Sequence, residues 1–132
     1  MVPAKILKKS MAKHHQTGKR GEGLAADLLR QKGYEVIEQN WRFSRAEVDI
    51  IARDGEVLVF LEVKTRRTQL YGHPAAFVTL KKRRFLADAA QEYMRMIAYE
   101  WAFRFDIISV IIPQGGKPMI EHFPDAFFPG LS

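Results

Sequence analysis

The chain has 132 residues and a hydrophobic content of 47%, which is enough for one sizeable core but too little for two domains of ordinary size. Its formal net charge of +6 favours a polyanionic partner, with nucleic acid ahead of an anionic membrane surface. The absence of cysteine excludes disulfides and thiolate metal sites, and no apolar run of the sequence is long enough to span a membrane. We therefore expect one soluble, cytoplasmic domain.

Residues 1–16 are predicted to form a mobile basic arm in front of a single domain over residues 17–132. The arm is rich in lysine and contains the His14-His15 pair, but its apolar residues show little periodicity. Adjacent side chains do not converge in ordered structure, so a solvated arm is favoured over a metal site at the two histidines. Met11 is a second candidate for the natural start of the chain.

The first half of the domain predicts one helix and three strands. The helix is expected over residues 18–32, because Thr17 can cap it and Gly33 can end it. Frequent β-branched and aromatic residues then predict strands over residues 34–43, 47–53 and 56–64. Asp54-Gly55 between the last two strands is a strong hairpin signal.

The second half predicts a longer helix and then further strands. Thr79 can cap the helix, which carries an apolar stripe at helical spacing. Residues 104–112 predict a fourth strand and residues 119–123 a short edge strand. This order indicates an α/β fold, with a mixed central β-sheet flanked by α-helices.

The predicted hairpin brings acidic residues onto one face of the sheet. If its turn consists of Asp54-Gly55 alone, Glu47 lies opposite Glu62 and Asp49 lies opposite Phe60. Strand alternation then places Lys64 on the same face as Glu62. The sequence therefore predicts one sheet face that holds all three carboxylates and this lysine.

Facing carboxylates repel each other, and native sheets seldom hold such pairs without a compensating cation. A hard divalent ion such as Mg²⁺ takes oxygen ligands, often one or two carboxylates together with water and substrate phosphates. Asp49 and Glu62 meet this requirement. Lys64 beside them could orient or deprotonate an attacking water, or stabilise charge on the phosphorane oxygens. The set suits phosphodiester hydrolysis.

Asp49 followed by Glu62-Val63-Lys64 resembles the catalytic pattern of the PD-(D/E)xK nuclease superfamily. A wider set of matches, over roughly residues 18–127, is similar to the bacterial YraN-type family of uncharacterised nuclease-like proteins, relatives of archaeal Holliday-junction resolvases. One departure is Ala46, where this family usually has glycine. The matching segments are Gly21-Glu22, Ala25-Ala26, Gly33-Tyr34, Asn40, residues 47–51, residues 59–66, Lys82, residues 104–106 and residues 125–127.

This resemblance implies a restriction-endonuclease-like fold and a metal-dependent endonuclease, but the family has no assigned substrate. We expect the substrate to be DNA, including branched or junction DNA, ahead of RNA. The resemblance also implies Mg²⁺ or Mn²⁺ bound by Asp49, Glu62 and the backbone carbonyl of Val63. Lys64 would be the catalytic lysine, and Glu22 would approach from the first helix. A homodimer would match the two-fold symmetry of a junction, although nothing in the sequence requires one.

Basic residues near these acids predict contacts to phosphate. Cations in the first turns of a helix oppose its dipole, so their placement points to a function other than stability. A solvated helix surface is the alternative. The predicted nucleic-acid contacts are Lys82, Arg66, Arg67, Lys81 and Arg83.

For several of these residues, a purely structural role is the alternative. Glu22 could instead interact favourably with the helix dipole. For Glu47, an ion pair with a nearby arginine is favoured. Arg104 and Asp106 share a face of the fourth strand and are expected to form a structural pair. For the whole chain, the alternative function is a non-catalytic nucleic-acid-binding module or an accessory subunit of a DNA-processing complex.

Overall fold

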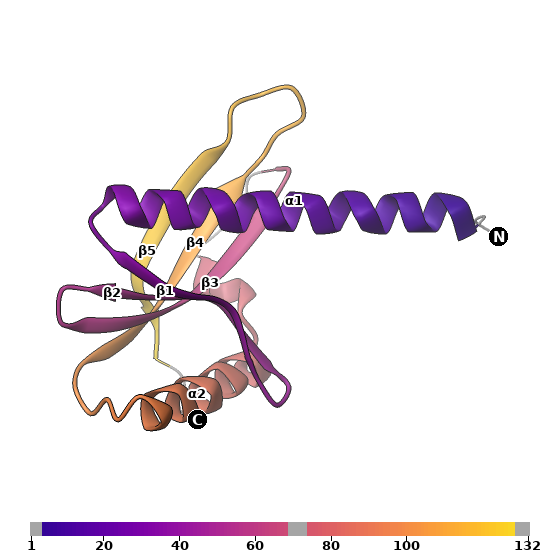
Figure 1. The fold of residues 1–132 in the computed structure, drawn as a ribbon. Coiled ribbons are helices and arrows are strands. Elements are labelled where there is room, and N and C mark those ends of the chain that lie inside the picture. The colour runs from indigo at the N-terminus through magenta and orange to yellow at the C-terminus, as the bar shows by residue number, and fades with distance from the viewer. Residues whose placement is uncertain (1–3, 69–73, 129–132) are drawn as a thin grey trace.

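The computed structural model describes the backbone of residues 4–68 and 74–128, and the side chains of this part from residue 17 onward, except those of Pro74 and Phe77. The described residues form two α-helices, five strands and one short 3₁₀ helix (Figure 1). In chain order the elements are α1 (Ala4–Gln31), β1 (Glu35–Phe43), β2 (Ala46–Asp54), β3 (Val57–Arg66), η1 (Pro74–Phe77), α2 (Leu80–Met96), β4 (Phe103–Ile111) and β5 (Met119–Phe127).

The five strands form one mixed sheet in the order β1-β2-β3-β4-β5. β1, β2 and β3 are an antiparallel meander, β4 runs parallel to β3, and β5 is antiparallel to β4. Parallel neighbours need a crossover connection, and α2 supplies it between β3 and β4. The predicted α/β fold with a mixed sheet flanked by helices is confirmed.

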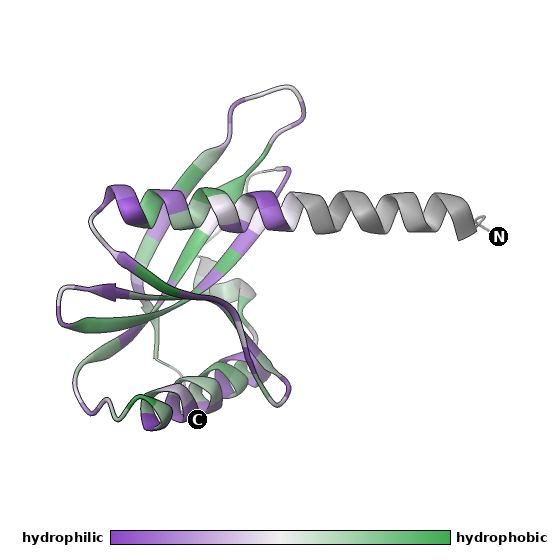
Figure 2. Cartoon of the chain, viewed as in Figure 1, coloured by the Kyte–Doolittle hydropathy of each residue, from purple (hydrophilic) through white to green (hydrophobic). Residues whose placement is uncertain are grey.

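One helix covers each face of the sheet (Figure 1). On the α2 side, Leu86 and Ala90 pack with Phe60 in one buried cluster. On the α1 side, Leu29 packs with Leu61 in a second cluster. Figure 2 shows the hydrophobic residues concentrated along the strands between the helices. Within the described residues, no helix combines the length and the apolar character needed to cross a membrane.

Several predicted boundaries differ from those in the structure. The first helix begins at Ala4 rather than residue 18. The side chains of residues 4–16, including His14 and His15, lie outside the described ones, so the mobile basic arm stays a prediction. β5 continues to Phe127, beyond the predicted end at residue 123. The cap at Thr79 is confirmed, because its hydroxyl accepts a hydrogen bond from the Lys82 N–H at 3.1 Å.

The predicted register of the β2–β3 hairpin is wrong by two residues. The turn consists of Gly55 and Glu56, and Asp54 pairs with Val57. Gly55 has φ +59 in the first central position, where a type II′ turn needs glycine; the prediction placed it second, as in an Asp-Gly type I′ turn. A shift of two keeps side chains on the same face wherever the strand is regular, but it moves Asp49 from opposite Phe60 to the level of Glu62.

Asp106 on β4 is fully buried and ties the C-terminal half of the sheet together. Its carboxylate accepts hydrogen bonds from Arg104 Nε at 3.0 Å, from His122 Nε2 at 2.7 Å and from the Asp125 N–H at 2.9 Å. Lys32 Nζ lies 2.6 Å from His122 Nδ1, which assigns the ring proton to Nε2. The expected Arg104–Asp106 pair is confirmed and is structural.

Burial opposes the charged form of Asp106, but the hydrogen bonds from His122, Arg104 and the Asp125 N–H outweigh it and hold the pKa of this carboxyl below its usual value. Asp106→Ala should therefore lower the free energy of unfolding by about 3 kcal/mol, because it leaves buried donors and the Arg104 charge without their acceptor. Urea denaturation followed by circular dichroism measures this loss.

Asp27→Ala is the matched control, because Asp27 pairs with Arg30 on the exposed surface of α1 at 3.4 Å. Exposed pairs of this kind contribute little, so the urea midpoint should hardly move. Equal losses in the two variants would contradict the structural role assigned to Asp106.

Candidate active site

Asp49 lies at an irregular point of β2. Two residues apart in a regular strand share a face, yet Val48 packs in the α2-side cluster and Ile50 in the α1-side cluster. The paired register of β2 with β3 ends at Ile50, and the Asp49 carboxylate replaces the next acceptor: the Val63 N–H donates to its Oδ2 at 2.8 Å. This contact fixes Asp49 beside the backbone next to Glu62.

Glu62 is a buried carboxylate between two lysines, with only 3% of its surface exposed. Its Oε1 lies 2.5 Å from Lys82 Nζ of α2 and 3.5 Å from Lys64 Nζ of β3. Its Oε2 is buried and has no hydrogen-bond partner within the part of the chain that the structure describes. A buried carboxylate oxygen without a donor is costly, which points to an additional ligand at this position.

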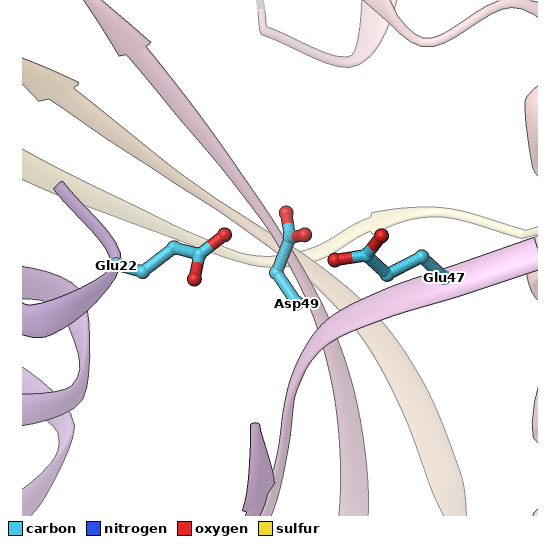
Figure 3. A group of neighbouring side chains, drawn as sticks. All are labelled: Glu22, Glu47 and Asp49. Atoms are coloured by element: carbon cyan, nitrogen blue, oxygen red, sulfur yellow. The ribbon is translucent and has the colours of Figure 1, made fainter. Parts of the chain in front are cut away.

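Asp49 also meets two further carboxylates next to Glu62. Glu22 of α1, Glu47 of β2 and Asp49 each offer one oxygen atom, and these atoms all lie within 4.8 Å of one another. Figure 3 shows Asp49 between the other two, with all three side chains pointing toward a common centre. Oxygens around one divalent ion, each about 2.0–2.6 Å from it, have this kind of separation. Glu47 also pairs with Arg42 at 3.1 Å.

Several carboxylates lie close together in this site, so a bound cation would reduce their mutual repulsion. Burial, together with the negative charge of Glu62, raises the pKa of Asp49 to about 8, and Glu22 adds to the effect. Although burial opposes the charged form of Lys82, Glu62 and Asp49 raise the pKa of this lysine above its usual value. Lys82 thus offsets part of the negative charge.

The donor set fits Mg²⁺ or Mn²⁺. The three converging atoms are carboxylate oxygens, which hard divalent ions prefer. Glu62, which is coupled electrostatically to Asp49, adds a buried oxygen that has no donor among the described residues. Asp49 belongs to this group, and Glu62 is next to it through the Val63 backbone. Glu47, Asp49 and Glu62, which were expected on one sheet face, therefore lie close together. Glu22 joins them from α1, and Lys64 contacts Glu62.

Asp49→Asn should stabilise the metal-free protein at pH 8 by about 1–2 kcal/mol, because it removes one of several buried like charges while its amide oxygen still accepts from Val63. We expect Mg²⁺ or Mn²⁺ to raise the melting temperature of the wild type and to have a much smaller effect on the variant. Thermal denaturation with chelator and with each metal measures both effects. A less stable Asp49→Asn protein would contradict the repulsion inferred here.

Gly21 sets how closely α1 approaches β3, and so where Glu22 is held. A Cβ atom added to Gly21 would lie 2.0 Å from the Thr65 hydroxyl oxygen, a distance that no packed structure allows. Gly23, on the same helix, has open space around the corresponding position. The glycine of the Gly21-Glu22 pair is therefore required for packing next to the site.

Gly21→Ala should cost about 1–3 kcal/mol, because α1 or Thr65 has to move. Gly23→Ala should instead stabilise the protein by about 0.5–1 kcal/mol through its better helix propensity. Thermal or urea denaturation separates the two. If Thr65→Ala, made in the Gly21→Ala background, restores none of the loss, the clash is not its cause.

The predicted phosphate-binding residues fall into two groups. Lys82 points inward to Glu62, and the Arg83 guanidinium is held by the carbonyl oxygens of Val78 at 3.0 Å and Ala75 at 2.5 Å. Arg83 therefore has a structural role. Lys81 is exposed, with its Nζ 5.9 Å from the centre of the Phe85 ring. Arg66 and Arg67 are exposed at the end of β3. These last three are open to solvent.

Sequence reasoning missed the second lysine on Glu62. Lys82 was predicted to bind phosphate. Its contact with Glu62 was not predicted, because no local signal marks a contact between residues 20 positions apart. Glu47 was predicted on the face of the site, with an ion pair to a nearby arginine favoured as its role. In the structure it pairs with Arg42 and also belongs to the carboxylate group.

Comparisons with known proteins agree with one another. The profile of a family described as "Uncharacterised protein family UPF0102" matches residues 21–110, a range that holds all the carboxylates and lysines of the site. A UPF0102 protein of Rhodococcus opacus is 46% identical over 118 residues, which cover 89% of this chain and 100% of that protein. A UPF0102 protein of Christiangramia forsetii is also 46% identical, over 89% of this chain and 98% of its own length. One of Geobacter sulfurreducens is 45% identical, over 86% and 91% respectively.

Proposed function

We propose a function for this chain, which belongs to the uncharacterised protein family UPF0102: it is a metal-dependent endonuclease that hydrolyses phosphodiester bonds, with DNA favoured over RNA. The observation that carries the proposal is the buried Glu62, whose Oε2 has no donor among the described residues although two lysines hold its other oxygen. We also propose that the chain is a member of the PD-(D/E)xK superfamily, because the mixed sheet and the two flanking helices suit that fold.

Asp49, Glu62 and the backbone carbonyl of Val63 would hold Mg²⁺ or Mn²⁺, with Glu22 and Glu47 beside them. Such an ion, when bound, supplies positive charge to a phosphate and makes a bound water more acidic. Asp49 is positioned for this role by the Val63 N–H, which fixes its Oδ2 and leaves its other oxygen available.

Lys64 is the proposed catalytic lysine. Its ammonium group lies 3.5 Å from Glu62 Oε1 and its side chain is mostly buried, so its position is set by the fold rather than by the substrate. A fixed positive charge of this kind orients an attacking water and stabilises the charge that develops on the phosphate oxygens. Lys82 of α2 binds the Glu62 carboxylate and keeps it in place.

The exposed cations Lys81, Arg66 and Arg67 are the proposed contacts to the nucleic-acid backbone. The alternative is a non-catalytic nucleic-acid-binding module or an accessory subunit. Clustered carboxylates count against this alternative, because they repel a polyanion and a protein that only binds nucleic acid does not need them. The net charge of +6 supports nucleic-acid binding in either case.

Incubation of the purified protein with Mg²⁺ or Mn²⁺ and labelled duplex, single-stranded, flap, four-way-junction and RNA substrates tests the proposal. Asp49→Asn, Glu62→Gln and Lys64→Met should each reduce the cleavage rate by about 100-fold or more, because each removes charge from the transition-state environment. Binding measured in chelator should persist in all three.

Asp27→Asn is the matched control, since it removes an exposed carboxylate of α1 outside the site and should leave cleavage unchanged. A wild-type protein that binds nucleic acid but cuts no substrate with either metal would favour the binding module. A protein that binds no nucleic acid at low salt would refute both readings.

A further inference from the structure

A groove runs outward from the carboxylates between the β1–β2 turn and α2. It consists of two adjoining hollows of about 400 and 440 Å³, both lined by Arg45, Ala46 and Phe85. The inner hollow reaches Asp49 and Lys82, and the outer one continues along α2 toward Asp88. Because the two hollows share these residues, we treat them as one feature and name it the α2 groove.

We infer that the α2 groove binds a single nucleic-acid strand that continues from the carboxylate site, with a base against Phe85 and phosphates at Arg45 and Lys81. The inference rests on the proposed function and gives it a substrate class: nucleic acid that is unpaired next to the cleaved bond.

The lining of the groove has the composition that single-strand binding requires. Such proteins combine cations that follow the backbone with aromatic rings on which bases stack. Phe85 is half-buried at the junction of the two hollows, Lys81 lies beside its ring, and Arg45 is exposed on the opposite wall. Ala46 is small, so the wall beside Phe85 stays open. Phe43, at 38% exposure, lines the outer hollow.

The size of the groove favours one strand over a duplex. Hollows of a few hundred Å³ take a single small ligand each, whereas duplex recognition uses a broad surface. Continuity with the site supplies the reason for a strand here, because a chain whose phosphate lies at Asp49 and Lys82 has its next nucleotide beside Phe85.

The charge of the groove also limits the length of the strand that it holds. Its inner part is flanked by Arg45 and Lys81, but its outer end carries Asp88 and Glu92, and Glu92 is already paired with Arg95 at 2.5 Å. Arg45 and Lys81 therefore offer backbone phosphates favourable partners in the inner part of the groove, whereas Asp88 disfavours them at the outer end. We expect a short contact of one or two nucleotides before the strand leaves the protein.

Fluorescence anisotropy in chelator tests the inference without cleavage. The wild type should bind a duplex with a short single-stranded overhang about tenfold more tightly than the blunt duplex, the effect of roughly one stacked base. Phe85→Leu and Arg45→Gln should each remove most of this preference while leaving blunt-duplex binding nearly unchanged. Arg84→Gln is the matched control, because Arg84 is exposed on α2 but does not line the groove, and it should keep the preference.

A second measurement does not depend on how well a variant folds. Photocrosslinking of wild-type protein to an overhang that contains 5-iodouracil should attach the base to Phe85, as read by mass spectrometry of the peptides. Equal affinity for blunt and overhang duplexes, or a crosslink only outside the groove, would overturn the inference.

The two proposals fail separately. A protein that cuts blunt duplex with Mg²⁺ and shows no overhang preference keeps the nuclease activity and loses the groove assignment. A protein that prefers overhangs through Phe85 but never cuts keeps the groove and loses the activity.

Discussion

Negative charge buried between β2 and β3 is the constraint on which the rest of the site depends. Glu62 is almost inaccessible to solvent, and Asp49 lies beside it through the Val63 N–H, so burial and the charge of Glu62 raise the pKa of Asp49. Lys82 from α2 and Lys64 from β3 offset part of that charge at one oxygen of Glu62. The position of α2 is thus linked to the electrostatics of the sheet as well as to its apolar contacts. A protein selected for stability alone would replace such a group with apolar residues.

The same fold holds a second buried acid, Asp106, in the opposite condition. Arg104, His122 and a backbone N–H all donate to it, and its pKa is lowered, whereas that of Asp49 is raised. The comparison distinguishes two uses of a buried carboxylate in one sheet. Asp106, whose oxygens all accept hydrogen bonds, fixes β5 onto β4. Glu62, next to Asp49, has an oxygen without a donor among the described residues and is therefore suited to bind a ligand.

The sequence predicted the elements and the Thr79 cap well, because these depend on residues close together in the chain. The gathering of the carboxylates also followed, since a register error of two residues preserves the face on which a side chain lies. Features that depend on distant residues could not be predicted. The Lys82–Glu62 contact joins two elements, and the change of face at Asp49 arises from strand irregularity that periodicity cannot express. Arg83 has the residue type of a phosphate ligand, and only the folded structure shows the carbonyls that it caps.

The parallel pairing of β3 with β4 has a consequence for how the protein folds. The β1–β2–β3 meander can form from local hairpins, but β3 gains its second neighbour only after the chain has passed through α2 and returned. Closing that long connection costs more chain entropy than closing a hairpin. Lys82 lies on α2, within this connection, and reaches back to Glu62 of β3. The charged centre therefore depends on the same crossover that pairs β3 with β4, so a chain in which α2 is detached from the sheet does not present it.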